Sequence, residues 1–427
     1  MRIYLDSIGC RLNQSEIENY ARQFRLAGHS LVPSAAEAEI SVINTCTVTN
    51  AADSDSRGKI RQAIRAGSNQ VVVTGCWSTL NPDQAAQIPG VTRVIQNAEK
   101  SWLVQDILDI PSETFELEPV ARELIPGARL RTRAFIKVQD GCDNHCTFCI
   151  TTIARGAGNS RDSNEILSDI THALNDGENM AAKEIVLTGV HLGSWGKDLP
   201  GNRHLADLIK LILDETDVPR LRISSLEPWD LDSKFFKLWD DPRLCRHLHL
   251  PLQSGSKEVL RRMARNTTPQ KFSRLVSAAR EVCPDIAITT DLITGFPGEN
   301  DQEFNETLEF VSRMSFSGGH VFTYSARPGT AAENMQNQVD FPIRKERNAR
   351  LRELLADSAQ KYQDPFMDQT LPVLWESVTK MESDTWHLHG LTDNYLRVNA
   401  HADQNLWNQI TPVRLSARDE KGFVGII

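Results

Sequence analysis

The 427-residue sequence has no run of about 20 apolar residues, the length that a membrane-spanning helix needs. Its opening stretch, MRIYLDSIGC, does not place a long apolar core after a basic start, so it does not resemble a secretory signal peptide. We therefore expect a cytoplasmic protein with no membrane segment. Thiols stay reduced in that compartment, so the eight cysteines indicate metal ligation or catalysis before disulfides.

An excess of positive charge is also missing. The 47 Lys and Arg residues are outnumbered by 56 Asp and Glu residues, which gives a net charge of −9. The protein as a whole therefore does not attract nucleic acid, and RNA binding would depend on a local groove or on shape. Basic residues do gather in three stretches, which are ordinary solvated faces in the simpler interpretation: Arg122–Arg133, Arg261–Arg265 and Arg344–Leu354.

Strand-like and helix-like segments alternate over the first hundred residues, which predicts an open parallel sheet with helices on both faces. The predicted strands are Ile3–Ile8, Ile40–Asn44, Gln70–Thr74 and Arg93–Gln96. The predicted helices are Gln14–Ala27, about Asn50–Ala66 and a short one that opens at Asn81.

One cysteine follows each of the first three predicted strands: Cys10, Cys46 and Cys76. Because the carboxyl ends of parallel strands meet at one edge, where such sheets assemble their sites, the three thiols should converge. The alternative is three unrelated buried cysteines, since a free cysteine packs as a small apolar residue. Three cysteines at three strand ends favour a metal site.

A second alternating block begins near Arg133, and its six strand–helix repeats predict a barrel or partial barrel of parallel strands. The predicted strands are Phe135–Val138, Glu184–Val190, Leu221–Ser225, Leu248–Leu252, Ile286–Thr290 and His320–Tyr324.

Three more cysteines, Cys142, Cys146 and Cys149, lie in the loop VQDGCDNHCTFCI after the first strand of this block. No fourth cysteine is near, whereas structural zinc uses four ligands and would need His145 or a distant residue. A [4Fe–4S] cluster is bound by thiolates, and three of them leave one iron open for a substrate or cofactor. The loop therefore favours an iron–sulfur cluster over zinc.

The C-x3-C-x2-C spacing, with Phe148 before the last cysteine, resembles the signature of radical S-adenosylmethionine (SAM) enzymes, in which the open iron chelates SAM. Together with Cys10, Cys46 and Cys76, the pattern resembles the methylthiotransferase family, whose members carry two such clusters. The resemblance covers nearly the whole chain.

Flanking stretches such as NTCTVTNAADSDSR, EIVLTGVHLGSWG and LHLPLQSGSKEVLRRMAR are most similar to the branch that acts on N6-threonylcarbamoyladenosine in tRNA. The branch that acts on isopentenyladenosine usually has Gln-Asn where this chain has Val190-His191. A further branch modifies an aspartate of a ribosomal protein. A rival from another class is a non-catalytic RNA-binding protein stabilised by structural metal.

The resemblance implies that the adenosine at position 37 receives a 2-methylthio group, with two [4Fe–4S] clusters and SAM as cofactors. The implied partners are the tRNA anticodon stem-loop, an electron donor such as flavodoxin or ferredoxin, and a sulfur source. A monomer needs no further assumption. The implied cluster ligands are Cys10, Cys46 and Cys76 for the auxiliary cluster, and Cys142, Cys146 and Cys149 for the cluster that cleaves SAM.

Several polar residues near the predicted strand ends are further candidates: Thr188, Ser225, Glu227, Gln253, Asp291 and Tyr324. By analogy with other barrel enzymes, we expect SAM to contact Thr188, Ser225, Gln253 and Asp291. Arg155 and Arg161 follow the cysteine loop and would meet tRNA phosphate or a cluster sulfur. The alternative is that both are ordinary solvated surface arginines. We interpret Cys245 and Cys283 as structural.

Short strand-like segments after Thr370 predict a small antiparallel barrel, and GLTDNYLRV resembles the TRAM domain, which binds tRNA in this family. The charge of residues 367–427 does not favour RNA, because five Lys and Arg stand against eight Asp and Glu. The sequence thus predicts an α/β protein with three parts: residues 1–128 with the auxiliary cluster, a radical SAM partial (β/α)6 barrel over 129–366, and a TRAM-like β-barrel over 367–427.

Overall fold

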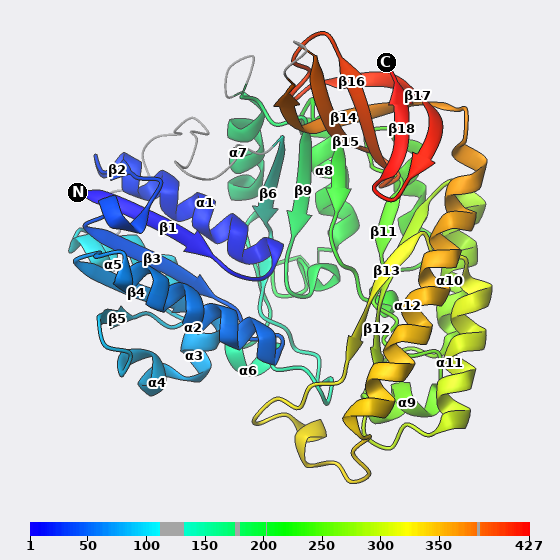
Figure 1. The fold of residues 1–427 in the computed structure, drawn as a ribbon, viewed down its shortest axis with the longest axis horizontal. Helices are drawn as coiled ribbons and strands as arrows, with labels where there is room; N and C mark the ends of the chain where they lie inside the picture. Colours follow the sequence, from blue (N-terminus) through cyan, green and yellow to red (C-terminus); the bar gives the residue numbers. More distant parts are fainter. Residues whose placement is uncertain (112–131, 176–179, 202, 382–384) are drawn as a thin grey trace.

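The computed structural model describes residues 1–111, 132–175, 180–201, 203–381 and 385–427. An N-terminal sheet with its helices lies beside a larger six-stranded sheet, and a small barrel near the C-terminus covers one end of the larger sheet (Figure 1). The predicted boundary at residue 128 falls outside the described residues. No helix in the described ranges is long and apolar enough to cross a membrane.

The N-terminal sheet is open and parallel, as predicted, with the strand order β2-β1-β3-β4-β5. Its strands are β1 (Arg2–Ser7), β2 (Ser30–Leu31), β3 (Ile40–Thr45), β4 (Gln70–Gly75) and β5 (Val91–Val94). The sequence did not reveal β2, because a two-residue edge strand has no alternation to detect.

Helices cover both faces of this sheet. On one face α1 and α5 pack Phe24 and Leu103 against Ile3 and Val42, and on the other α2 packs Ile60 against Val73. The helices are α1 (Arg11–Leu26), α2 (Asn50–Arg65), α3 (Cys76–Leu80), α4 (Pro82–Ala86) and α5 (Leu103–Leu108).

The larger sheet is the predicted partial barrel. Its strands form two parallel groups, β10-β9-β6 and β11-β12-β13, which isolated parallel bridges join at Leu221–Leu244 and Ser225–His249. The strands are β6 (Arg133–Lys137), β9 (Glu184–Thr188), β10 (Leu221–Ile223), β11 (His247–His249), β12 (Ala287–Thr294) and β13 (Gly318–Thr323). A short hairpin of β7 (Gln139–Asp140) and β8 (Asn159–Ser160) flanks the cysteine loop.

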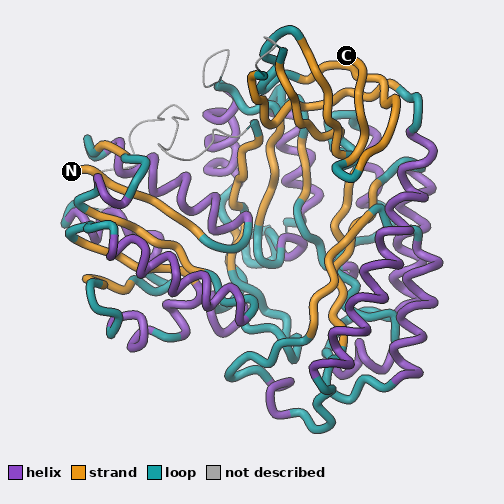
Figure 2. Tube along the Cα trace, viewed as in Figure 1, coloured by secondary structure: helices purple, strands orange, loops and turns teal. Residues whose placement is uncertain are grey.

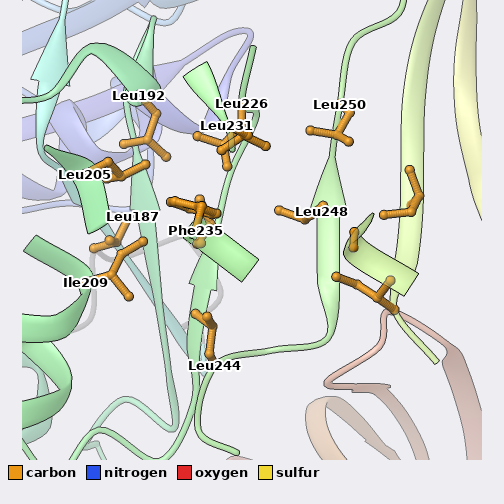
Figure 3. Packing of buried hydrophobic residues seen from close by; sticks show 14 of the residues in the cluster. Leu187, Leu192, Leu205, Ile209, Leu226, Leu231, Phe235, Leu244, Leu248 and Leu250 are labelled. Atoms are coloured by element: carbon orange, nitrogen blue, oxygen red, sulfur yellow. The ribbon is translucent and has the colours of Figure 1, made fainter. Parts of the chain in front are cut away.

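Helices line the outer side of the partial barrel (Figure 2). Leu187 of β9 packs there with Ile209 of α8, and Leu226, Phe235 and Leu248 extend the same core (Figure 3). The helices are α6 (Thr151–Arg155), α7 (Ser163–Leu174), α8 (Leu205–Glu215), α9 (Lys257–Arg262), α10 (Pro269–Val282), α11 (Asp301–Met314) and α12 (Phe341–Gln363). Alternate residues of each strand face the opposite, concave side, where polar groups gather.

The tail forms a closed five-stranded barrel in the order β14-β15-β16-β18-β17, with one parallel pairing, β16 with β18. The strands are β14 (Thr370–Lys380), β15 (Trp386–Thr392), β16 (Arg397–Ala402), β17 (Ile410–Asp419) and β18 (Gly422–Ile426). Tyr395 has a φ of +69° and belongs to the turn before β16, so this strand begins only at Arg397.

The tail barrel docks on the larger sheet through a buried ion pair. Arg222 of β10 donates to Glu184 of β9 at 2.6 Å, and neither side chain is exposed. The same guanidinium donates to the backbone carbonyls of Thr392 and Asp393 at 3.3 and 3.0 Å. Tyr395 then stacks on His247 with ring centroids 4.2 Å apart.

We predict that Glu184→Gln destabilises the protein, because it leaves the Arg222 charge buried without a carboxylate. The expected loss is about 3 kcal/mol or more in the free energy of unfolding, measured by urea denaturation. The matched control is Glu258→Gln, in an exposed pair with Arg261, and it should change stability by less than about 0.5 kcal/mol. Equal losses in the two variants would contradict the prediction.

Candidate functional site

The three N-terminal cysteines lie on neighbouring strands at the edge predicted for them. Cys10 caps α1 just after β1, Cys46 follows β3, and Cys76 opens α3 directly after β4. Because β1, β3 and β4 are adjacent and parallel, the three thiols share one sheet edge. The strands thus bring together the auxiliary set that the sequence suggested.

Two glycines make this arrangement possible. Gly9 has a φ of +103° and Gly75 a φ of +97°, a region that side chains with a Cβ rarely adopt. A Cβ on Gly9 would lie 2.6 Å from both Cβ and Sγ of Cys46, and one on Gly75 would lie 2.4 Å from the Thr45 carbonyl oxygen. Each glycine lets the strand end turn sharply and places the next residue, a cysteine, over its neighbour.

Amide side chains hydrogen-bond to this set of thiols. The Cys10 thiol donates to Oδ1 of Asn13 at 3.7 Å, and Asn97 Nδ2 donates to Cys76 Sγ at 3.6 Å. Burial raises the pKa of Cys46 to about 11. Cys10 keeps solvent exposure, although enough protein surrounds it to raise the pKa of its thiol as well.

The second cysteine loop runs from β7 to α6. Thr147 fixes its middle, since its N–H donates to the Met263 carbonyl at 3.1 Å and its hydroxyl to the Arg262 carbonyl at 2.9 Å. Backbone N–H groups point at two of the sulfurs: Asn144 donates to Cys142 Sγ and Thr151 to Cys149 Sγ, both at 3.4 Å.

These surroundings fit thiolate-bound iron–sulfur clusters. Three sulfurs in each set supply the donors, and N–H donors to sulfur stabilise the negative charge of such a centre. Within the described residues, no three His, Cys, Asp or Glu side chains are already spaced as ligands of a metal ion. The two triads therefore provide the donors and their scaffold, not a closed coordination sphere.

An arginine that the sequence analysis did not single out lies at the cysteine loop. Arg265 is buried, its Nη1 lies 3.7 Å from Cys146 Sγ, and it pairs with Glu227, at 3.0 Å between Nη1 and Oε1. The guanidinium also lies over the Trp229 ring, 4.5 Å from the centroid, while its Nε has no hydrogen-bond partner. Only its place in the basic stretch RRMAR hinted at a role.

His191, used above to separate the family branches, also lies beside the loop. Its Nε2 is 2.6 Å from Asp230 Oδ2, and the ring hydrogen-bonds to the Cys142 thiol. Burial lowers the pKa of His191, but hydrogen bonds to Asp230 and Cys142 outweigh burial and raise the pKa to about 9. A residue that separates the branches thus contacts a proposed cluster ligand.

Of the four residues expected to contact SAM, Thr188 ends β9, and Ser225 and Gln253 follow β10 and β11, whereas Asp291 lies within β12 because that strand extends to Thr294. The structure brings three of the four onto neighbouring strands. Ser225 bridges to His249, and the Gln253 N–H donates to the Asp291 carbonyl at 2.8 Å. The Asp291 carboxylate lies between His249 and His320, at 3.2 and 3.3 Å.

The fourth, Thr188, is buried at the end of β9. Contact of any of the four with SAM stays a prediction. Of the further candidates, Glu227 pairs with Arg265, and the Tyr324 hydroxyl is buried without a hydrogen-bond partner.

The two cysteine sets are neighbours because a helix from each is in contact. Asn97 joins them directly: its Nδ2 donates to Cys76 Sγ and, at 2.7 Å, to the carbonyl of Ala154 in α6. In Figure 1 the strands of the first sheet and β6 and β9 run toward the same central region beside α6. The carboxyl edges of the two sheets therefore face each other, as expected.

Buried charged residues close the interface. Arg155 of α6 donates to Asp140 at 2.9 Å, to Glu16 of α1 at 3.1 Å and to Asn13 at 2.8 Å. The Arg155 side chain is only 3% exposed, so it cannot meet tRNA phosphate. The prediction that Arg155 contacts tRNA phosphate is therefore wrong. Arg161 instead pairs with Asp169 at 2.9 Å.

A second clamp explains part of the NTCTVTNAADSDSR stretch. Arg327, which follows β13, is buried and donates to Thr47 at 2.6 Å and to Asp53 at 2.7 Å. Thr47 directly follows Cys46 and Asp53 lies in the first turn of α2, so the segment that carries this thiol also binds the partial barrel.

We predict that Gly9→Ala disrupts the auxiliary set, because its Cβ would overlap the Cys46 side chain. The variant should lose about 2 kcal/mol or more of stability and most of the iron bound by the N-terminal cysteines. Thermal unfolding and iron analysis after anaerobic reconstitution measure the two effects. Gly67→Ala is the matched control, since Gly67 has a similar φ of +96° but open space around it; normal iron in both variants would refute the argument.

Comparison with known proteins places these features in a family. Residues 136–311 match the Radical SAM superfamily, and residues 2–96 match a family described as uncharacterized protein family UPF0004. The threonylcarbamoyladenosine tRNA methylthiotransferase MtaB of Bacillus subtilis is 35% identical, over 96% of this chain and 92% of that protein. The tRNA-2-methylthio-N(6)-dimethylallyladenosine synthase of Alkaliphilus oremlandii is 28% identical, over 96% and 89%.

Among solved structures, the radical SAM methyltransferase TsrM of Kitasatospora setae, with cobalamin and a [4Fe–4S] cluster, has a similar fold. The TM-score is 0.58 at 14% identity, over 78% of this chain and 77% of that one. Because full-length similarity above 30% identity is shared with methylthiotransferases of the threonylcarbamoyladenosine branch, the chain belongs to the threonylcarbamoyladenosine tRNA methylthiotransferase family of radical SAM enzymes.

Proposed function

We propose that this protein adds a 2-methylthio group to N6-threonylcarbamoyladenosine at position 37 of tRNA. The observation that carries the proposal is the pairing of two three-cysteine sets, each at the carboxyl edge of a parallel sheet and joined by Asn97. One three-thiolate site suits SAM cleavage, and a second beside it suits delivery of sulfur to the same base.

We propose that Cys142, Cys146 and Cys149 hold one [4Fe–4S] cluster, and that Cys10, Cys46 and Cys76 hold the auxiliary one. When bound, these clusters and SAM supply the radical and methylthio chemistry, which the protein itself does not provide.

The chain's own residues position these groups. The Thr147 contacts fix the cysteine loop, and N–H donors from Asn144 and Thr151 support its sulfurs. Glu227 and Arg265 form an ion pair beside Cys146. The Glu227 carboxylate would complement the amino group of SAM, and the Arg265 guanidinium would complement its carboxylate. The ion pairs of Arg155 with Glu16 and Asp140 join the two parts of the chain beside a cavity of about 750 Å³ that both parts line.

The parts of the chain divide this work. The N-terminal sheet, within residues 1–128, carries the auxiliary site, and the partial barrel, within 129–366, carries SAM. The tail, 367–427, binds the anticodon stem-loop through shape and splayed bases, since its net charge is negative. An electron donor such as flavodoxin or ferredoxin and a sulfur source complete the reaction in the cytoplasm, with the protein acting as a monomer.

The relatives favour the threonylcarbamoyladenosine substrate over the alternatives. The relative named for that nucleoside is 35% identical, against 28% for the relative named for dimethylallyladenosine. The ribosomal-protein aspartate is not favoured by either of these relatives. A non-catalytic RNA-binding protein would not need two open three-cysteine sets.

Nucleoside mass spectrometry of tRNA tests the function directly. Deleting the gene should remove 2-methylthio-N6-threonylcarbamoyladenosine and let its unmethylthiolated precursor accumulate. Loss of 2-methylthio-isopentenyladenosine instead would move the substrate to the other branch, and an unchanged profile would reject the tRNA assignment.

Restoring the gene with single Cys→Ala changes tests the ligands. Each of the six proposed ligand cysteines should give no detectable product, because each cluster loses a thiolate. The matched control is Cys283→Ala, since Cys283 lies at the end of α10 away from both sets. Full activity with any one of the six replaced would overturn the ligand assignment.

A further inference from the structure

Five charged side chains meet at the interface between the two sheets: Glu16 and Lys100 from the N-terminal part, and Lys137, Asp140 and Arg155 from the partial barrel. Two of the ion pairs meet at Asp140: Arg155 lies 2.9 Å from its carboxylate and Lys100 lies 3.1 Å from it. The side chains of Glu16, Lys100 and Arg155 are each at most 5% exposed. Lys137 and Asp140 are 22% and 19% exposed, so the group is mostly buried and borders the cavity between the two sheets. It is named here the interface charge cluster.

The interface charge cluster is not neutral. Three cations share two carboxylates, and within the described part of the chain no third carboxylate forms an ion pair with any of the three. Both carboxylates are ionised, because the cations hold the pKa of Glu16 and Asp140 low against the raising effect of burial. One positive charge is left over, and a positive charge that is largely removed from water is stabilised by an anionic group nearby.

Arg155 places that charge beside the N-terminal cysteines. Its Nη2 donates to Asn13 Oδ1 at 2.8 Å, and the same oxygen accepts the Cys10 thiol at 3.7 Å. The residue before it, Ala154, accepts from Asn97, which also contacts Cys76.

We propose that Arg155 is a positioning residue for the auxiliary cluster: its guanidinium offsets the negative charge that three thiolates and the cluster bring, and so raises the cluster's reduction potential. The inference rests on the proposed function in one respect, that Cys10, Cys46 and Cys76 hold a [4Fe–4S] cluster. Net charge around such a cluster is one of the quantities that set its potential. Arg155 belongs to α6, the helix that follows Cys149. A residue next to the SAM-cleaving cluster therefore adjusts the reduction potential of the auxiliary cluster.

The test uses the full-length chain with Cys142, Cys146 and Cys149 replaced by alanine, so that only the auxiliary cluster gives a signal. After anaerobic reconstitution, its midpoint potential is measured by titration monitored with electron paramagnetic resonance. Arg155→Met should shift the midpoint to a more negative value, and Arg155→Lys, which keeps the charge, should restore most of the shift. Arg161→Met is the matched control and should leave the midpoint unchanged, because Arg161 pairs with Asp169 instead.

Asp140→Asn guards against a variant that fails to fold. It removes a carboxylate while keeping the side-chain shape, so the surplus charge grows and the midpoint should move the other way, to a more positive value. Shifts of opposite sign support the proposal, whereas an unchanged midpoint in Asp140→Asn, or a shift in Arg155→Met no larger than in Arg161→Met, overturns it. If the parent protein binds no cluster, the ligand assignment under the proposed function fails instead, and the inference fails with it.

Discussion

Two parallel sheets that meet edge to edge are the constraint on which the rest of the structure depends. The proposed function, in which both three-cysteine sets act on one base, requires both sets at carboxyl edges and requires those edges to face each other. The ion pairs of the interface charge cluster and the Arg327 clamp to Thr47 and Asp53 hold that arrangement. Loops alone would not hold the two sheets in a fixed position relative to each other.

The same constraint explains residues that otherwise have no connection. Gly9 and Gly75 are needed because each thiol must turn over the neighbouring strand within one residue. Asn13 and Asn97 are needed because amides can contact a thiol on one side and the opposite sheet on the other. The glycines next to the cysteines thus allow the sharp turns, and the asparagines connect the thiols to the partial barrel.

The sequence predicted the parts of the fold that rest on local patterns. Alternating apolar runs located both parallel sheets, and the position of the cysteines after strands predicted that each set of three would lie at one sheet edge. The patterns could not reveal Arg265, because its contact with Cys146 joins positions 119 residues apart through tertiary packing. The contacts of Arg155 were missed for a similar reason: its acceptors Glu16 and Asn13 belong to α1 of the N-terminal part, far away in the sequence.

The way in which the tail is held has a consequence for how this part of the protein can change over time. Arg220 donates hydrogen bonds to the backbone carbonyls of Pro372 and Leu391, and Arg222 donates to those of Thr392 and Asp393. A backbone carbonyl is present whichever side chain the residue carries. Substitutions on the outer face of the tail can therefore accumulate without loosening its attachment, as long as the barrel keeps its backbone course. The outer surface of the tail can therefore change while the partial barrel stays fixed.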